Sequence, residues 1–242
     1  MDEINQDFLI TVCTPSYNSA PFLYRVYQGL LDQTYKQFEW IIIDDGSTDN
    51  TKEVVNSFLN DPKRQFNLTY YFQENMHKKV ALLNGIQKAE GDLFVVCDAD
   101  DRLTPRALSL FAEYWKPIFN LQNYICVLLR CIDEKCKLVG VPFTVPYFDS
   151  DYLEMEYKLK LNTDFIECWK TIFLKDNFPD LSNVPGFVPE SYWFRKFGLE
   201  KYKMRYVNEI GRIYYRNVET SIKHTVYKNI LNNIYGILLN LK

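Results

Sequence analysis

The 242-residue sequence lacks three features that would each indicate a particular class of protein. It contains no apolar run near the roughly 18 residues that a membrane-spanning helix requires. Its net charge of -3 gives no basic excess, which argues against a general nucleic-acid-binding protein. Its first residues are acidic and polar, unlike a signal peptide. We therefore expect a cytoplasmic protein with reduced thiols and no transmembrane segment.

Histidine is also scarce, and cysteine lacks the spacing of a zinc site. The chain has two histidines, and its six cysteines contain no CxxC pair. Cys131 and Cys136, five residues apart, could share a metal, but with only two histidines in the chain we do not favour a metal site there. Cys13 and Cys97 lie in apolar segments, where cysteine usually acts as a small hydrophobic residue. We expect structural thiols.

The first half of the chain alternates apolar strands with amphipathic helices. Strands are expected over 8–13, 38–43, 68–72 and 93–97, and helices over 21–33, 48–59 and 78–89. This alternation predicts an α/β fold with a mostly parallel sheet covered on both faces. After about residue 115 the alternation fades into strands at 124–131, 137–141 and 205–215, a short helix near Glu190 and an amphipathic helix over 226–242.

Three carboxylates follow the fourth apolar strand in the stretch Asp98-Ala99-Asp100-Asp101. Adjacent carboxylates repel one another unless a cation compensates their charge. Oxygen-rich clusters suit Mg²⁺ or Mn²⁺, and ligands of α/β sheets usually bind at the carboxyl ends of the strands. The four residues alone leave a second interpretation open, namely a solvated turn that caps a helix beginning near Thr104.

Polar turns also follow the first two strands. Thr14-Pro15-Ser16-Tyr17-Asn18 offers a ring and a hydroxyl, although turn residues often have no further role. In Asp44-Asp45-Gly46-Ser47, a carboxylate could accept a hydrogen bond from a base or a ribose, and Gly46 allows close backbone approach. The alternative is an acid-rich helix start, which suits Asp45 but not Asp44, the last residue of its strand.

Taken together, these segments resemble a GT-A-fold glycosyltransferase of family 2. The match covers 14–18, 33–35, 38–49 and 98–101, in that order and in the same strand context. The resemblance implies inverting transfer of a sugar from a nucleoside-diphosphate sugar, with a UDP-sugar favoured and Mn²⁺ or Mg²⁺ as cofactor. It also implies a hydroxyl acceptor on a glycan or a lipid-linked acceptor, as in bacterial-type cell-surface polysaccharide synthesis.

The resemblance assigns roles to individual residues. The positions that match the donor site are Pro15, Tyr17, Asn18, Asp44, Asp45, Lys78, Asp98 and Ala99. Asp98 and Asp100 match the metal-linked DxD motif, with Asp100 as the direct ligand. Lys78 matches a basic position near a phosphate, and His224 is a further candidate in a C-terminal loop near the diphosphate.

The chain departs from the family pattern in two places. Met76 and His77 stand where glycines are common before the third helix, which leaves the course of that loop open. Glu190 matches the first acid of a Glu-Asp pair at a helix start but is followed by Ser191. A single carboxylate suffices to deprotonate an acceptor hydroxyl, so we expect Glu190 to be the catalytic base, with helix capping as the alternative. The other candidate bases are Asp164 and Asp180.

Acceptor recognition is expected in the second half of the chain. Trp169 and Trp193 could stack on an acceptor sugar or could pack in the core. We interpret 1–115 as the donor half, 116–225 as the acceptor half, and 226–242 as an amphipathic helix that packs on the domain, on a partner or on the inner face of the cell membrane.

Two other functions compete with this interpretation. A metal-dependent nucleotidyltransferase would normally carry a glycine-rich phosphate loop after the first strand, and residues 15–18 contain no glycine. A catalytically inactive nucleotide-sugar-binding protein would have lost the metal acids or the base, and both sets are present in this sequence.

Overall fold

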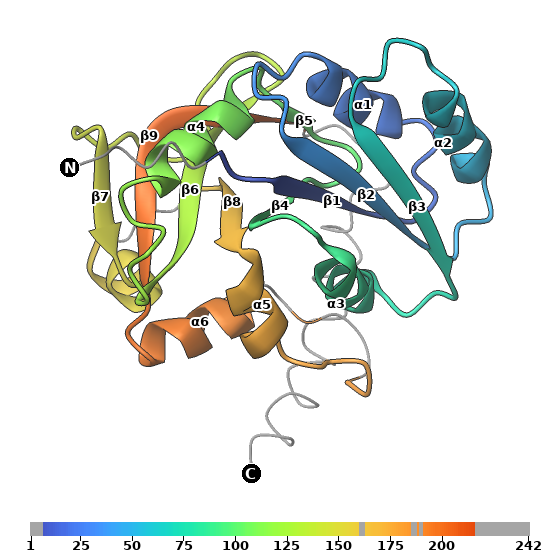
Figure 1. Ribbon diagram of the computed structural model, residues 1–242. Helices are drawn as coiled ribbons and strands as arrows, with labels where there is room; N and C mark the ends of the chain where they lie inside the picture. Colours follow the sequence, from blue (N-terminus) through green and yellow to red (C-terminus); the bar gives the residue numbers. More distant parts are fainter. Residues whose placement is uncertain (1–6, 160–162, 185–187, 189–190, 216–242) are drawn as a thin grey trace.

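The computed structural model describes residues 7–159, 163–184, 188 and 191–215, and within them the chain forms one nine-stranded sheet with helices on both faces (Figure 1). Glu190, His224 and the predicted helix 226–242 lie outside the described residues. The strand order is β3-β2-β1-β4-β8-β6-β9-β5, and β7 pairs with β9 as well. In the described part of the chain, β3, β2, β1, β4, β6 and β9 point the same way, and β8, β5 and β7 run opposite.

The first half follows the predicted alternation. Its elements are β1 (Ile10–Ser16), α1 (Leu23–Leu31), β2 (Phe38–Asp45), α2 (Thr51–Leu59), β3 (Asn67–Gln73), α3 (Lys78–Lys88), β4 (Leu93–Val96), β5 (Arg102–Leu103) and α4 (Ala107–Trp115). Nearly continuous apolar runs form β1, β2 and β4 because both faces of these strands are covered.

The second half contains more structure than the sequence indicates. Its elements are β6 (Tyr124–Asp133), β7 (Tyr147–Ser150), the π-helix η1 (Glu154–Leu159), β8 (Phe165–Lys170), α5 (Thr171–Asn177), α6 (Ser191–Leu199) and β9 (Lys203–Tyr214). The predicted strands at 124–131 and 205–215 are confirmed as β6 and β9. The strand predicted over 137–141 is wrong, because this segment makes a single bridge between Ile132 and Leu138.

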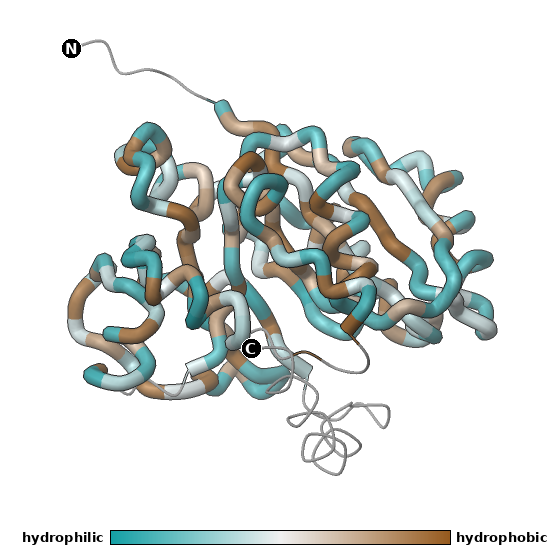
Figure 2. Tube along the Cα trace, turned by 90° about the horizontal axis from the view of Figure 1, so that it is seen from below, coloured by the Kyte–Doolittle hydropathy of each residue, from teal (hydrophilic) through white to brown (hydrophobic). Residues whose placement is uncertain are grey.

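Two hydrophobic cores lie on the two faces of the sheet. One core packs α1, α2 and α4 against the sheet, with Trp40 and Trp115 fully buried. The other packs α3, α5 and α6 on the opposite face around Trp169 and Phe197. Figure 2 shows hydrophobic and hydrophilic segments following one another along the whole chain, as expected where elements present one face to a core and the other to water.

The buried tryptophans settle one alternative left by the sequence. Trp169 is 3% exposed and packs its ring against Phe194, while Trp193 is 5% exposed and packs against Phe178. Both residues are therefore core residues and do not present a face to an acceptor. None of the helices in the described residues is long and apolar enough to cross a bilayer.

Candidate active site

The loops that follow β1, β2 and β4 meet at one edge of the sheet. Ser16 at the end of β1 pairs with Asp44 at the end of β2, and Cys13 pairs with Val96 at the end of β4. These three strands are parallel and adjacent, so their carboxyl ends share one edge, which is where ligands of α/β sheets bind. The polar turns predicted from the sequence are therefore brought together.

Side-chain hydrogen bonds join the loops after β1 and β2. The backbone N–H of Asn18 donates to Ser47 Oγ at 2.8 Å, and the N–H of Thr48 donates to Asn18 Oδ1 at 2.8 Å. Asn18 adopts a left-handed backbone (φ 49°), which its short amide tolerates. Pro15 is buried within β1, whereas the Tyr17 side chain is 53% exposed beside these loops.

Asp44 and Asp45 are buried and hydrogen-bonded. Asp44 accepts from the Ser47 N–H at 2.8 Å and from the Tyr70 hydroxyl at 2.5 Å. Burial and the hydrogen bond to Asp44 raise the pKa of Tyr70 above its usual value. Asp45 accepts from Gln73 Nε2 at 2.7 Å and from the backbone N–H of Met76 at 2.8 Å. The pair therefore shapes the turn after β2 and fixes the loop before α3.

Gly46 provides the close approach that the sequence indicates. Its φ is 81°, and a Cβ at this position would lie 2.8 Å from the backbone nitrogen of Asn75. A side chain would therefore separate the turn after β2 from the loop that leads into α3. In that loop His77 has φ 70°, and α3 begins at the next residue, Lys78.

Lys78 points to the acidic turn. Its Nζ lies 2.7 Å from Asp98 Oδ1, and each side chain is about one-third exposed. Burial acts to raise the pKa of Asp98, but the charge and the hydrogen bond of Lys78 lower it overall. The predicted basic residue is thus placed beside the acidic turn as the ion-pair partner of Asp98.

The other residues of the turn differ in environment. Asp100 is partly exposed, and burial followed by the charge of Asp98 raises its pKa. Ala99 is 9% exposed and packs into the core, which leaves its backbone as the part that could contact a donor. Arg25 Nη1 donates to the backbone carbonyl of Asp100 at 3.1 Å and holds this side of the turn to α1.

Asp101 is the buried member of the acidic turn and does not act as a solvated helix cap. It is 1% exposed, and its Oδ2 lies 3.2 Å from Nη1 of Arg212 on β9. Burial raises the pKa of Asp101 to about 7, against the lowering effect of the Arg212 charge. Sequence reasoning missed Arg212, because nothing in the residues around it points to Asp101.

Asp98 and Asp100 suit a divalent cation by their chemistry. Both are partly exposed carboxylates, and the charge of Asp98 raises the pKa of Asp100, a repulsion that a cation would relieve. Within the described residues no three or more His, Cys, Asp or Glu side chains gather as a metal site. Two carboxylates with phosphate and water as the other ligands are an arrangement that Mg²⁺ and Mn²⁺ accept.

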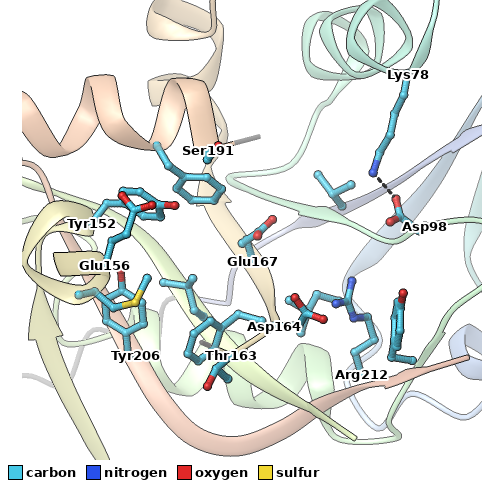
Figure 3. Close-up of a pocket in the computed structure, with 17 residues that line it drawn as sticks. Lys78, Asp98, Tyr152, Glu156, Thr163, Asp164, Glu167, Ser191, Tyr206 and Arg212 are labelled. Carbon is cyan, nitrogen blue, oxygen red and sulfur yellow. Dashed lines mark ion pairs between the residues drawn. The ribbon is translucent and has the colours of Figure 1, made fainter. Parts of the chain in front are cut away.

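A cavity of about 630 Å³ extends from Lys78 and Asp98 toward the second half of the chain. Figure 3 shows Tyr152 and Glu156 at its far end and Glu167 between the two ends. Asp164, one of the two other candidate bases, lines the cavity, whereas Asp180, the second, is not among its lining residues. Glu167 belongs to β8, a strand that was not predicted from the sequence, so its place beside the cavity was not predicted either.

The far end of the cavity has acidic and aromatic walls. Arg195 on α6 makes two hydrogen bonds to Glu156, at 2.8 and 3.2 Å. Tyr152 stacks on Phe194 with 5.1 Å between ring centroids. Ser191, the first residue of α6, also lines the cavity, and in the sequence it directly follows Glu190. Polar groups between aromatic walls are the usual composition of a small-molecule site.

Comparison with known sequences identifies the family. The family model described as "Glycosyl transferase family 2" matches residues 11–135. A Campylobacter jejuni protein named GalNAc(5)-diNAcBac-PP-undecaprenol beta-1,3-glucosyltransferase is 28% identical over 240 residues, covering 95% of this chain and 72% of that protein. The chain spans less than half the length of the first four curated relatives that it matches.

Solved structures show the same fold. Staphylococcus aureus TarS 1-349 in complex with UDP-GlcNAc aligns with a TM-score of 0.65 at 18% identity, covering 88% of this chain and 60% of that one. The mannosyltransferase PcManGT from Pyrobaculum calidifontis in complex with GDP-Man and Mn²⁺ aligns with a TM-score of 0.64 at 17% identity, covering 95% and 63%. The fold is therefore the GT-A fold predicted from the sequence. Because the family model covers about half of the chain, the chain belongs to glycosyltransferase family 2.

Proposed function

We propose that this protein transfers a sugar, with inversion, from a nucleoside-diphosphate sugar to a hydroxyl of a glycan or lipid-linked acceptor in bacterial-type cell-surface polysaccharide synthesis. The observation that carries the proposal is the meeting of Asp44, Asp98, Asp100 and Lys78 at one sheet edge, beside a cavity large enough for a sugar. The C. jejuni relative is named as a glucosyltransferase, and PcManGT was solved with GDP-Man and Mn²⁺.

The donor nucleoside binds at the loops after β1 and β2. The exposed Tyr17 ring stacks on the base, and Asp44 accepts a hydrogen bond from a base N–H. Each oxygen of Asp44 accepts one hydrogen bond from the protein, and a carboxylate oxygen can accept a second. A UDP-sugar is the favoured donor, and the backbones of Asn18 and Ala99 line the same site.

The diphosphate binds at the acidic turn. Asp98 and Asp100 would hold a divalent cation, which supplies positive charge against the negative charge that develops on the departing diphosphate. Lys78 already lies 2.7 Å from Asp98, and a short rotation of its side chain brings the ammonium to a phosphate oxygen. The turn and the start of α3 therefore act on the leaving group together.

The acceptor binds in the cavity. Glu190 takes the proton from the acceptor hydroxyl as this oxygen attacks the anomeric carbon, and the bond to the diphosphate breaks on the opposite side. Because Ser191 lines the cavity, its sequence neighbour Glu190 is the favoured base. Asp164, which lines the cavity, is the next candidate for the catalytic base.

The test is a transfer assay with a panel of UDP-, GDP- and CDP-sugars, Mn²⁺ and short glycan or lipid-linked acceptors. Acceptor-dependent release of a nucleoside diphosphate supports the proposal. Transfer of the nucleotidyl group with release of a sugar 1-phosphate instead indicates a nucleotidyltransferase, and donor binding without any product indicates an inactive binding protein. Glu190→Gln should abolish transfer and preserve donor binding, whereas the control Glu200→Gln should preserve both. Full activity in Glu190→Gln moves the base to Asp164.

A further inference from the structure

β9 carries two arginines that pair with aspartates, and they lie in different surroundings. Arg205 donates from Nε and Nη2 to the two oxygens of Asp149, both at 2.9 Å. Arg212 places Nη1 3.2 Å from Asp101 Oδ2. The side chains of Arg205 and Arg212 are 8% and 12% exposed, so both ion pairs are largely shielded from water.

Arg212 lies between the acidic turn and the cavity. Its Nη1 faces Asp101, and its Nε donates to Cys131 Sγ at 3.2 Å on the neighbouring strand β6. The same side chain lines the cavity together with Asp98 (Figure 3). Arg205, by contrast, is not among the cavity-lining residues, and its ring contact at 4.4 Å is with Tyr147 of β7.

The backbone around Arg212 is joined to the chain just after the acidic turn. β5 pairs with β9 through Arg102 with Ile213 and Leu103 with Arg212. Thr104 Oγ1 donates to the Ile210 carbonyl at 2.8 Å. β9 therefore holds the chain that follows the acidic turn through backbone pairing and the Thr104 hydrogen bond. The ion pair between Asp101 and Arg212 adds a side-chain contact between the turn and β9.

Three carboxylates in one turn repel one another unless counter-ions compensate their charge, and Lys78 pairs with Asp98 while Arg212 pairs with Asp101. Asp101 is buried against Arg212, which leaves Asp98 and Asp100 facing the donor side. A buried ion pair is costly to break because the remaining charge has no water to solvate it. Without Arg212, the buried Asp101 carboxylate would lose the side chain that holds it, and its neighbour Asp100 would lose a fixed position in the turn.

We propose that Arg212 is a positioning residue that fixes Asp101 and thereby sets the places of Asp98 and Asp100 for the diphosphate and its cation. The inference rests on the proposed function, since it takes the ligand to be a nucleoside diphosphate. Arg212 also joins the donor turn to the cavity, because one side chain contacts the first and lines the second.

The rival explanation is that Arg212 only stabilises the fold, as Arg205 does. The two arginines make a matched pair, since they lie on one strand and both are paired and buried. Arg212→Met, Arg212→Lys and Asp101→Asn are compared with Arg205→Met. The readouts are the melting temperature and the dissociation constant of UDP or GDP, whichever binds the wild type, measured by calorimetry with saturating Mn²⁺ and with EDTA.

We expect Arg205→Met to lower the melting temperature and to leave the dissociation constant unchanged. Arg212→Met should weaken Mn²⁺-dependent binding by about tenfold or more, and Arg212→Lys by less. If Arg212→Met does not fold, Arg212→Lys and Asp101→Asn carry the test. Unchanged binding in the folded Arg212 and Asp101 variants, beside a wild type that binds, overturns the inference alone. A wild type that binds no nucleotide overturns the proposed function and the inference with it.

Discussion

Lys78 Nζ lies 2.7 Å from Asp98 Oδ1, so the first residue of α3 pairs with one carboxylate of the acidic turn that follows β4. This pair holds the donor-side carboxylate in a defined place before any ligand arrives. It also keeps an ammonium group beside the predicted phosphate position, where it can exchange one anionic partner for another.

Lys78→Met should weaken binding of nucleoside diphosphates by about tenfold, because it removes a charge-assisted hydrogen bond to the phosphates. Calorimetric titration with UDP and GDP in the presence of Mn²⁺ measures the effect. The matched control is Lys88→Met on the same helix, where the ammonium lies 4.1 Å from the ring centroid of Tyr71, a contact made away from the acidic turn. Equal affinities in the wild type and Lys78→Met would exclude Lys78 from the phosphate site.

Asp100→Asn should lower the metal-dependent affinity for nucleotide without lowering the stability of the metal-free protein. In the absence of metal the variant should be at least as stable as the wild type, because burial and the nearby charge of Asp98 already disfavour the charged form of Asp100 and raise its pKa. With Mn²⁺ and nucleotide, it should lose about tenfold or more in affinity.

Thermal melting with EDTA, and then with Mn²⁺ and nucleotide, measures both effects of Asp100→Asn. Asp176→Asn, an exposed aspartate on α5, is the control for charge alone. Retention of full Mn²⁺-dependent stabilisation by Asp100→Asn would remove this residue from the metal site.

Asp149→Asn should make the protein less stable at neutral pH by about 2 kcal/mol, since Arg205 loses its partner. Burial acts to raise the pKa of Asp149, but the hydrogen bonds from Arg205 and Tyr124 bring it below its usual value. A carboxyl with a lowered pKa stabilises the fold above its unfolded pKa, and this contribution disappears as the pH falls through the folded pKa.

The stability difference between the wild type and Asp149→Asn should therefore stay constant between about pH 8 and pH 5 and shrink below about pH 4. Urea unfolding at a series of pH values measures it. A difference that is as large at the lowest pH as at neutral pH would show that charge on Asp149 is not its source.

Trp169→Ala should cost about 3–5 kcal/mol, the usual range for removing a buried aromatic side chain. Trp169→Phe should cost much less, because a phenyl ring can still pack against Phe194. The ring centroids of Trp169 and Phe194 lie 5.2 Å apart. Since the side chain is 3% exposed, Trp169→Phe should also leave the KM for the acceptor unchanged. A raised acceptor KM in a variant with near-normal stability would restore a binding role for this residue.

The first half of the fold could be predicted from the sequence because its signals are local. β1, β2 and β4 are short apolar runs that end in polar turns, and covered parallel strands have this pattern. The turn residues mark the sheet edge directly, so Asp44 and Asp98 could be placed near each other before their contacts were known. The close approach at Gly46 was predictable for the same reason.

The second half of the fold could not be predicted to the same degree because its structure depends on contacts between residues far apart in the sequence. β8 was missed since Glu167 and Lys170 interrupt its apolar residues. Lys170 is nevertheless 8% exposed, because its ammonium donates to the Leu121 carbonyl at 2.7 Å and lies 5.5 Å from the Trp115 ring centroid. No window of sequence around Lys170 contains these partners.

Two further features could not be predicted for the same reason, namely contacts between residues far apart in the sequence. The segment 137–141 has the apolar residues of a strand, but its Val141 carbonyl accepts from Arg130 Nη2 at 2.8 Å in place of a ladder partner. Asp101 appears in the sequence as one more acid of a solvated turn, and only the return of β9 brings Arg212 to it. Long-range pairing of this kind decides which acid faces the ligand.

The central claim is that the acidic turn and its neighbours form a donor site for a nucleoside diphosphate. Thermal melting of the full chain with UDP, GDP, CDP and ADP, each with Mn²⁺ and each with EDTA, tests it most directly. Stabilisation by one of these nucleotides that depends on Mn²⁺ and is lost when Asp98 and Asp100 are both changed to Asn is the predicted result. No stabilisation of the folded wild type by any of them, with or without Mn²⁺, would contradict the account.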